Sequence, residues 1–151
     1  MLSVATGTFD VSTTPITEPT AMPGRFKLEK QFHGDLVGTG QGEMLTAMTD
    51  TKGSAGYVAI EQVQGTLRGK RGAFVFQHTG TMSRGAQQLS ITVVPDSGTG
   101  ELVGIAGSCA ILVEGKEHRY SFEYALPESG SSMAARVAHR ATRARAAGAR
   151  R

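Results

Sequence analysis

Glu61 and His78 are the two ionisable side chains whose placement could support acid–base chemistry in this sequence. Both lie between residues 55 and 82, where alternating polar and apolar residues predict two strands joined by a tight turn. A carboxylate that accepts a hydrogen bond from an imidazole fixes the tautomer of the imidazole and raises the imidazole's pKa. Apolar surroundings lower the imidazole's pKa instead. Such a pair could act as a general acid and base. The alternatives are a buried pair that only stabilises the fold, or two residues that never meet.

The strand pattern places both residues on faces that we expect to line an interior. Side chains two positions apart on a strand share a face. Val58 and Ile60, on the opposite face of the first strand, argue against this choice for Glu61. The glycines and charges of residues 65–72 suit a solvent-exposed turn between the strands. The residues that share a face with Glu61 are Tyr57, Ala59 and Val63, and those that share a face with His78 are Phe74 and Phe76.

Lys30 is a third ionisable residue on an apolar face, which it shares with Phe26, Leu28 and Phe32. A buried ammonium group needs a partner or a depressed pKa. Lys30 could therefore lie near a strand end and reach water along its aliphatic stem. The other interpretation is a role inside the cavity, and the sequence leaves both open.

Gly38, Gly40 and Gly42 fall on one strand face, in a GxGxG run. A dinucleotide-binding loop would need a strand before the glycines and a helix after them, and both flanks here read as strands. Glycines aligned on one face instead let a strand coil strongly, or let a ligand or another side chain approach the backbone. Small closed barrels need such places.

The whole chain up to residue 127 reads as strands and turns, with no convincing helix. Regular strand spacing without a helical period predicts an all-β sandwich or barrel. Eight strands linked mostly by hairpins close naturally into a single antiparallel up-and-down barrel of lipocalin-like form, which removes exposed edges. The predicted strands cover residues 2–14, 26–33, 35–47, 55–64, 73–82, 87–94, 101–113 and 118–126. The strand over 101–113 is interrupted at Gly104 and Gly107, where we expect a bend or bulge.

Five segments of the chain resemble a known family. That family consists of small bacterial proteins of unknown function, with a barrel similar to plant allene oxide cyclase. The resemblance implies an eight-stranded antiparallel barrel with a central cavity, but it transfers no activity. The plant enzyme's catalytic motif is missing here, and related bacterial cyclases keep an enzyme hypothesis open by analogy only. The segments are GEMLTA (42–47), AGYVAIEQVQGTL (55–67), FVFQHTGTM (74–82), VVPDSGTGELVGIAG (93–107) and YSFEYALP (120–127).

Composition separates a barrel domain, residues 1–127, from a basic tail, residues 128–151. The net charge of +3 belongs to the tail, which holds six arginines and only one acidic residue. Alanine and arginine favour helix, so we expect the tail to be either a short helix or a disordered extension. Weak contact with acidic surfaces, nucleic acid or lipid is its functional alternative. The barrel carries no basic stripe, so we predict no nucleic-acid binding through it.

The remaining composition predicts a soluble, cytoplasmic protein without a membrane span or signal segment. Cys109 is the single cysteine, so no internal disulfide can form, and we expect a small buried hydrophobic residue there. His33, His78 and His118 are scattered, so no metal site is predicted. No cofactor is predicted either.

Three functions follow as hypotheses. The first is a binding barrel for a small apolar or amphipathic molecule, with Glu61, His78 and Lys30 as polar anchors. The second is a cofactor-independent isomerase or cyclase in which Glu61 or His78 transfers a proton. The third is a filled structural barrel whose outer face self-associates into a homo-oligomer. The candidate ligand-lining residues are Phe26, Phe32, Tyr57, Phe74, Phe76, Tyr120, Phe122 and Tyr124.

Overall fold

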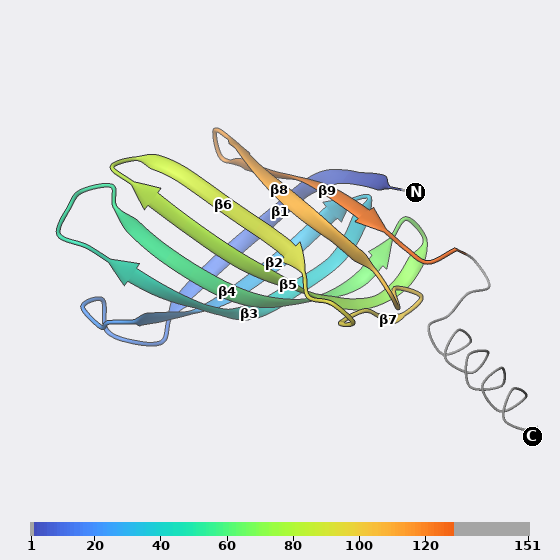
Figure 1. Ribbon diagram of the computed structural model, residues 1–151, viewed down its shortest axis with the longest axis horizontal. Coiled ribbons are helices and arrows are strands. Elements are labelled where there is room, and N and C mark those ends of the chain that lie inside the picture. Colours follow the sequence, from blue (N-terminus) through green and yellow to red (C-terminus); the bar gives the residue numbers. More distant parts are fainter. Residues whose placement is uncertain (1, 129–151) are drawn as a thin grey trace, which may run out of the picture.

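Eight long antiparallel strands curve into a closed barrel in the computed structural model, which describes residues 2–128 (Figure 1). A ninth, two-residue strand, β7, lies beside one end of β5. No helix of residues 2–128 has the length and apolar character needed to span a membrane. The strands are β1 (Ser3–Pro15), β2 (Gly24–Gly34), β3 (Leu36–Met48), β4 (Ala55–Leu67), β5 (Lys70–Ser83), β6 (Ala86–Val93), β7 (Thr99–Gly100), β8 (Ala106–Glu114) and β9 (Glu117–Ala125).

Nearly every long strand pairs with its neighbours in sequence, as an up-and-down barrel requires. The ring runs β1–β2–β3–β4–β5–β6–β8–β9 and closes where β9 pairs with β1. This order confirms the predicted eight-stranded barrel. The seam between β6 and β8 is the shortest, formed by Ile91 opposite Cys109 and Thr92 opposite Ser108.

The inner and outer faces of the central hairpin, β4 and β5, are those that the alternation predicts. Glu61 and His78 are 0% and 3% exposed, whereas Val58 and Ile60 are 47% and 53% exposed. The apolar character of Val58 and Ile60 therefore does not bring them inside. Strand parity, not the hydrophobicity of single residues, determines which side chains enter the barrel.

Aromatic rings fill the middle of the barrel. The ring of Phe122 stacks on that of Phe74 with centroids 5.6 Å apart, and it meets the ring of Phe76 edge-on at 5.2 Å. Tyr124 lies beside Phe122 on the same strand, at 5.3 Å. Tilted and edge-on aromatic contacts of this kind stabilise a core beyond the area that they bury.

The turn between β4 and β5 is shorter than the predicted turn over residues 65–72. Only Arg68 and Gly69 lie outside the strands, with φ angles of +46° and +81°. Two residues with positive φ match the twist of the flanking strands, so the hairpin closes tightly. The flanking residues 65–67 and 70–72 continue the β4–β5 ladder.

The predicted strand over residues 101–113 is wrong in its first part, where the chain turns at Gly104, one of the two glycines at which a bend or bulge is expected. Residues 101–104 form a turn, and β8 begins at Ala106. Gly104 takes a φ of +82°, which a strand does not allow. The turn buries Leu102 and Ile105 in the hydrophobic core. These apolar residues therefore close one end of the barrel instead of extending its wall.

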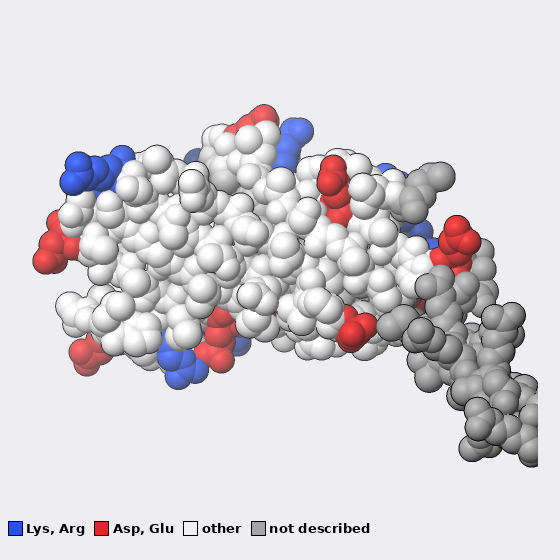
Figure 2. All heavy atoms as spheres, viewed as in Figure 1, with Lys and Arg blue, Asp and Glu red and all other residues white. Residues whose placement is uncertain are grey.

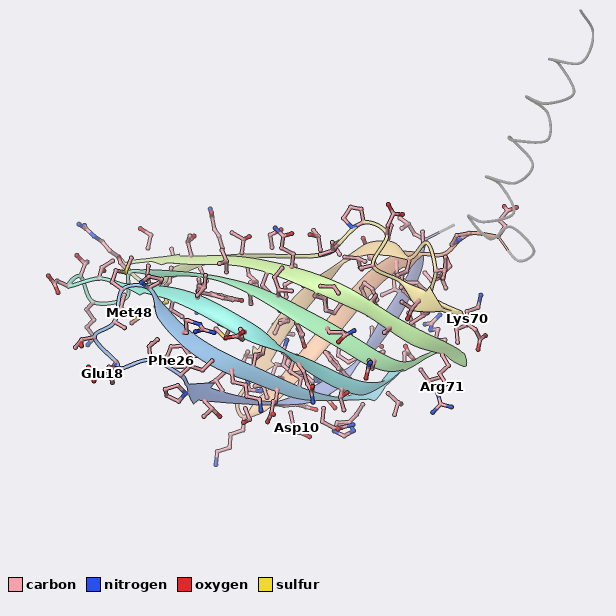
Figure 3. All side chains as sticks on the ribbon, turned by 90° about the horizontal axis from the view of Figure 1, so that it is seen from below. Asp10, Glu18, Phe26, Met48, Lys70 and Arg71 are labelled. Carbon is pink, nitrogen blue, oxygen red and sulfur yellow. The ribbon has the colours of Figure 1, made fainter. Side chains whose placement is uncertain are left out.

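The two ends of the barrel differ. We call the mouth the end that carries the β1–β2 and β3–β4 loops and the β5–β6 turn (Figure 1). Phe26 and Met48 lie at this end, and Lys70 and Arg71 lie at the opposite end (Figure 3). The predicted tail, apart from Glu128, lies outside the described residues.

Candidate functional site

Lys30, Glu61 and His78 meet inside the barrel, and we call them the buried triad. Glu61 Oε1 accepts a hydrogen bond from Lys30 Nζ at 3.2 Å and lies 2.8 Å from His78 Nε2. The three residues come from β2, β4 and β5. A carboxylate oxygen needs a donor at that distance, so Nε2 carries the proton that faces Glu61.

Glu61 is ionised in this setting. Burial opposes its charge, but the hydrogen bond from His78 and the charge of Lys30 outweigh burial and hold the pKa of Glu61 below its ordinary value. Both donors use Oε1, and Glu61 Oε2 is buried without a hydrogen-bond partner among the described residues. An unsatisfied buried carboxylate oxygen costs free energy, so Oε2 reduces what the ion pair contributes to stability.

Gly40 on β3 provides the space for the Glu61 carboxylate. A Cβ atom added at Gly40 would lie 2.1 Å from Glu61 Oε2 and 3.1 Å from the Phe32 ring. In the strand register Gly40 stands opposite Lys30 on β2 and Val63 on β4. The predicted role of the glycine face, to let another side chain approach the backbone, is thus met by Glu61.

Lys30 lies in the middle of β2, so the interpretation that it reaches water at a strand end is wrong. It is 9% exposed, and its ammonium group lies 4.8 Å from the ring centre of Phe9 and 5.8 Å from that of Phe32. Aromatic faces attract a cation, and the ion pair with Glu61 supplies the opposite charge. Lys30 is therefore a partnered buried cation.

Six of the eight aromatic residues predicted to line a ligand cavity belong to the packed core, and Phe26 and Tyr57 are the two that do not. Phe74, Phe76 and Phe122 are buried in the core, and the Tyr120 hydroxyl donates to the His33 carbonyl oxygen at 2.9 Å. The void beside the triad measures about 10 Å³, which is room for about one water molecule. The middle of the barrel is filled in this structure.

A larger pocket of about 360 Å³ opens at the mouth, and we call it the mouth pocket. Its volume lies in the range typical of small-molecule sites. Of the residues predicted from the sequence to bind a ligand, Tyr57 lines it. The lining residues are Met44, Thr46, Met48, Ala55, Gly56, Tyr57, Gly80, Thr81, Met82, Gln87, Gln88 and Leu89.

Tyr57 connects the mouth pocket to the buried triad. Its ring packs on Gly80, where an added Cβ atom would lie 2.3 Å from Tyr57 Cε1. The ring centroids of Tyr57 and His78 are 6.4 Å apart. Burial and the charge of Glu61 raise the pKa of Tyr57, so its hydroxyl stays protonated at neutral pH.

Sequence reasoning missed the methionines of the mouth, Met44, Met48 and Met82. Alternate residues of a strand share a face, so Met82 lies on the same inward face of β5 as His78. Met44 and Met48 likewise lie on the same face of β3 as Gly42. That signal was present in the sequence. The alternation of side chains does not indicate which inward positions lie in the filled middle of the barrel and which lie at its open end.

Within residues 2–128, the other reactive side chains make no hydrogen bond to the buried triad, although Cys109 lines the same small void as Lys30 and His78. No group of three or more His, Cys, Asp or Glu residues in residues 2–128 could hold a metal ion. His33 pairs with Asp10 at 2.9 Å on the exposed side of the barrel. Cys109 is partly buried against the core, and burial raises the pKa of its thiol to about 12.

Comparison with known proteins gives a family but no activity. Residues 5–124 match a family model described as "Protein of unknown function (DUF3224)". A crystal structure of a protein with unknown function from the DUF3224 family, from Shewanella oneidensis MR-1, superposes with a TM-score of 0.80. The two chains are 47% identical, over 85% of this chain and 100% of that one. No curated protein matches.

Proposed function

Because the chain belongs to the DUF3224 family of proteins of unknown function, we propose its function from the site alone: it binds a small apolar or amphipathic molecule in the mouth pocket. The observation that carries this proposal is the pocket of about 360 Å³ above an interior that is otherwise filled. Ligand sites are mostly apolar concavities with a few polar groups. The mouth pocket combines methionine and leucine side chains with threonine, glutamine and tyrosine.

The methionines make this surface adaptable. Met44 and Met82 are half-buried and Met48 is largely exposed, and all three line the pocket. Unbranched thioether side chains fit ligands of differing shape because they change rotamer easily. We therefore expect binding of several related molecules rather than of a single rigid one.

A blocking substitution tests the proposal. Ala55 lines the pocket, so Ala55→Trp should fill it, whereas Thr79→Trp adds the same ring on the exposed outer face of β5. The natural chain has no tryptophan, so both variants can be followed by their own fluorescence. We expect saturable binding of Nile red, an uncharged dye, to the natural protein and to Thr79→Trp. Binding by Ala55→Trp should be weaker by on the order of tenfold. Equal binding by all three proteins would contradict a site at the mouth.

Proton-transfer catalysis is the second candidate, and the contact between His78 and Glu61 favours it. Their 2.8 Å hydrogen bond leaves the other imidazole nitrogen, Nδ1, as the basic atom. His78 and Gly80 are consecutive inward-facing residues of β5, and Gly80, the one nearer the mouth, lines the mouth pocket. A substrate in the pocket would then lie next to a base oriented by a carboxylate, as isomerisation or cyclisation requires. The likeness to allene oxide cyclase stays an analogy.

Variants separate catalysis from a structural role of the pair. Glu61→Gln and His78→Ala should each abolish turnover of an unsaturated substrate while circular dichroism shows an intact fold. His33→Ala, on the exposed side, is the matched control and should keep full turnover. If both interior variants unfold instead, the pair is structural.

Self-association is the third candidate, favoured by the outer face of β4, β5 and β6. The face of the molecule in Figure 2 is largely free of charged side chains, which gather at its margins. Val58 and Ile60 are about half exposed on the outer face of β4. Exposed apolar side chains on an uncharged face are typical of interaction surfaces. Sedimentation of the natural protein against Ile60→Lys should show a loss of dimer if this face associates.

A further inference from the structure

Among residues 2–128, no charged side chain lines the mouth pocket. Its inward-facing polar side chains are Thr46, Tyr57 and Gln87, whereas Thr81 and Gln88, which also border it, point outward by strand alternation. Of the described residues that line the pocket, Tyr57 alone is ionisable. Hydroxyls and amides can both donate and accept hydrogen bonds, but they do not neutralise a full charge.

The charges beneath the pocket compensate one another. Lys30 is the cation of the buried triad, and its ammonium group is 3.2 Å from Glu61 Oε1. His78 hydrogen-bonds the same oxygen. A carboxylate ligand would therefore find the charge of Lys30 already balanced by Glu61. An ammonium ligand would likewise find the charge of Glu61 already balanced by Lys30, although Oε2 accepts no hydrogen bond from residues 2–128. A charged group taken from water without a partner loses its hydration at a large cost.

We infer that the mouth pocket selects an uncharged ligand, a molecule with a mostly apolar body and a hydroxyl, carbonyl or amide group. This inference rests on the proposed function and names the chemical class of its ligand. Carboxylates and ammonium ions are rejected because neither the pocket lining nor the triad offers them an unpaired opposite charge. Neither Lys30 nor Glu61 lines the pocket, so Glu61 acts on this selection indirectly, by balancing the charge of Lys30 beneath it.

Three probes that share one alkyl chain test the inference: decanol, decanoate and decylammonium. The binding reporters are the methyl signals of Met44, Met48 and Met82 in protein labelled with 13C at its methionine methyl groups. Met22, which is exposed and does not line the pocket, is the internal reference. At neutral pH we expect decanol to shift the three mouth signals saturably and to leave Met22 unchanged. Decanoate and decylammonium should bind weaker by at least about tenfold.

The outcomes distinguish the inference from the function on which it rests. If decanoate or decylammonium binds at the mouth as tightly as decanol, the pocket binds ligands but the selection for uncharged ones is wrong. If none of the three probes moves the mouth signals, binding at the mouth fails, and the inference fails with it.

Glu61→Gln gives a second, independent test, with Glu43→Gln as the matched control. Glu43 is a carboxylate on the outer face of β3, where it pairs with Arg25. Removing the Glu61 charge should strengthen decanoate binding by on the order of tenfold relative to decanol, because the anion then supplies the partner of Lys30. Glu43→Gln should leave the ratio unchanged. An unchanged ratio in folded Glu61→Gln would overturn the role of Glu61. If that variant does not fold, the three probes on the natural protein still decide the inference.

Discussion

Two donors share a single oxygen in the buried triad. Lys30 and His78 both hydrogen-bond Glu61 Oε1, while Oε2 lies in the space left by Gly40 without a partner in the described chain. A fully satisfied ion pair would use both oxygens. Removing one member of a buried pair leaves an uncompensated charge, which costs far more than removing both members.

Glu61→Gln should therefore lower the free energy of unfolding by about 3–5 kcal/mol, because it leaves the Lys30 cation without a counter-charge. Urea unfolding at neutral pH measures this loss. The double variant Lys30→Met/Glu61→Gln removes both charges and should recover at least half of it. A double variant as unstable as the sum of the two single variants would contradict the coupling of the pair.

The pH dependence of stability follows from the same carboxylate. The pKa of Glu61 in the folded protein lies below its ordinary value of 4.5, so its contribution is present above that pH and is lost as the pH falls through the folded-state pKa. We expect the melting temperature to fall below about pH 4.5, and to fall less steeply in Lys30→Met/Glu61→Gln. Equal slopes in the two proteins would show that Glu61 does not contribute to the acid sensitivity.

Cys109 should be unreactive in the folded protein. Burial raises the pKa of its thiol to about 12, so the thiolate fraction at pH 8 is very small. Labelling with Ellman's reagent at pH 8 should be slow in buffer and fast in concentrated urea. Rapid labelling of the folded protein would show that the interior opens at the β6–β8 seam, where Cys109 pairs with Ile91.

At the scale of the elements, the glycines of β3 allow the neighbouring strands to carry large inward side chains. Gly40→Ala should destabilise the protein by about 1–3 kcal/mol, because the new methyl group would meet the Glu61 carboxylate. Gly56→Ala, in the neighbouring strand, is the matched control, since the nearest atom to its Cβ would be 3.8 Å away. Thermal unfolding of the two variants compares them. If both lose the same stability, the space at Gly40 is not what holds the triad.

Strand parity is the part of this fold that could be predicted from sequence. It placed Glu61 and His78 inside, because the two-residue repeat of a strand depends only on local geometry. The partner of Lys30 could not be predicted, since it depends on which strands become neighbours across the barrel. The turn that buries Leu102 could not be predicted either. A short apolar run has the same sequence pattern whether it forms a strand of the barrel or a turn that covers the end of the barrel.

On the scale of the whole molecule, the barrel is filled in its middle and open at one end. The void beside the triad holds about 10 Å³, whereas the mouth pocket holds about 360 Å³. The apolar plug around Leu102 and Ile105 closes the other end. Because only the mouth end is open, we expect a ligand to bind there. It would contact Tyr57, whose ring lies near His78 of the buried triad.

Native mass spectrometry of the protein purified from its own source tests ligand binding at the mouth most directly. A ligand bound there should appear as a stoichiometric adduct that denaturation releases as an uncharged, mostly apolar compound. Protein carrying Ala55→Trp, prepared in the same way, should lack the adduct, while Thr79→Trp should retain it. An adduct that persists at full occupancy in Ala55→Trp would contradict binding at the mouth, and a released carboxylic acid would contradict the selection for uncharged ligands.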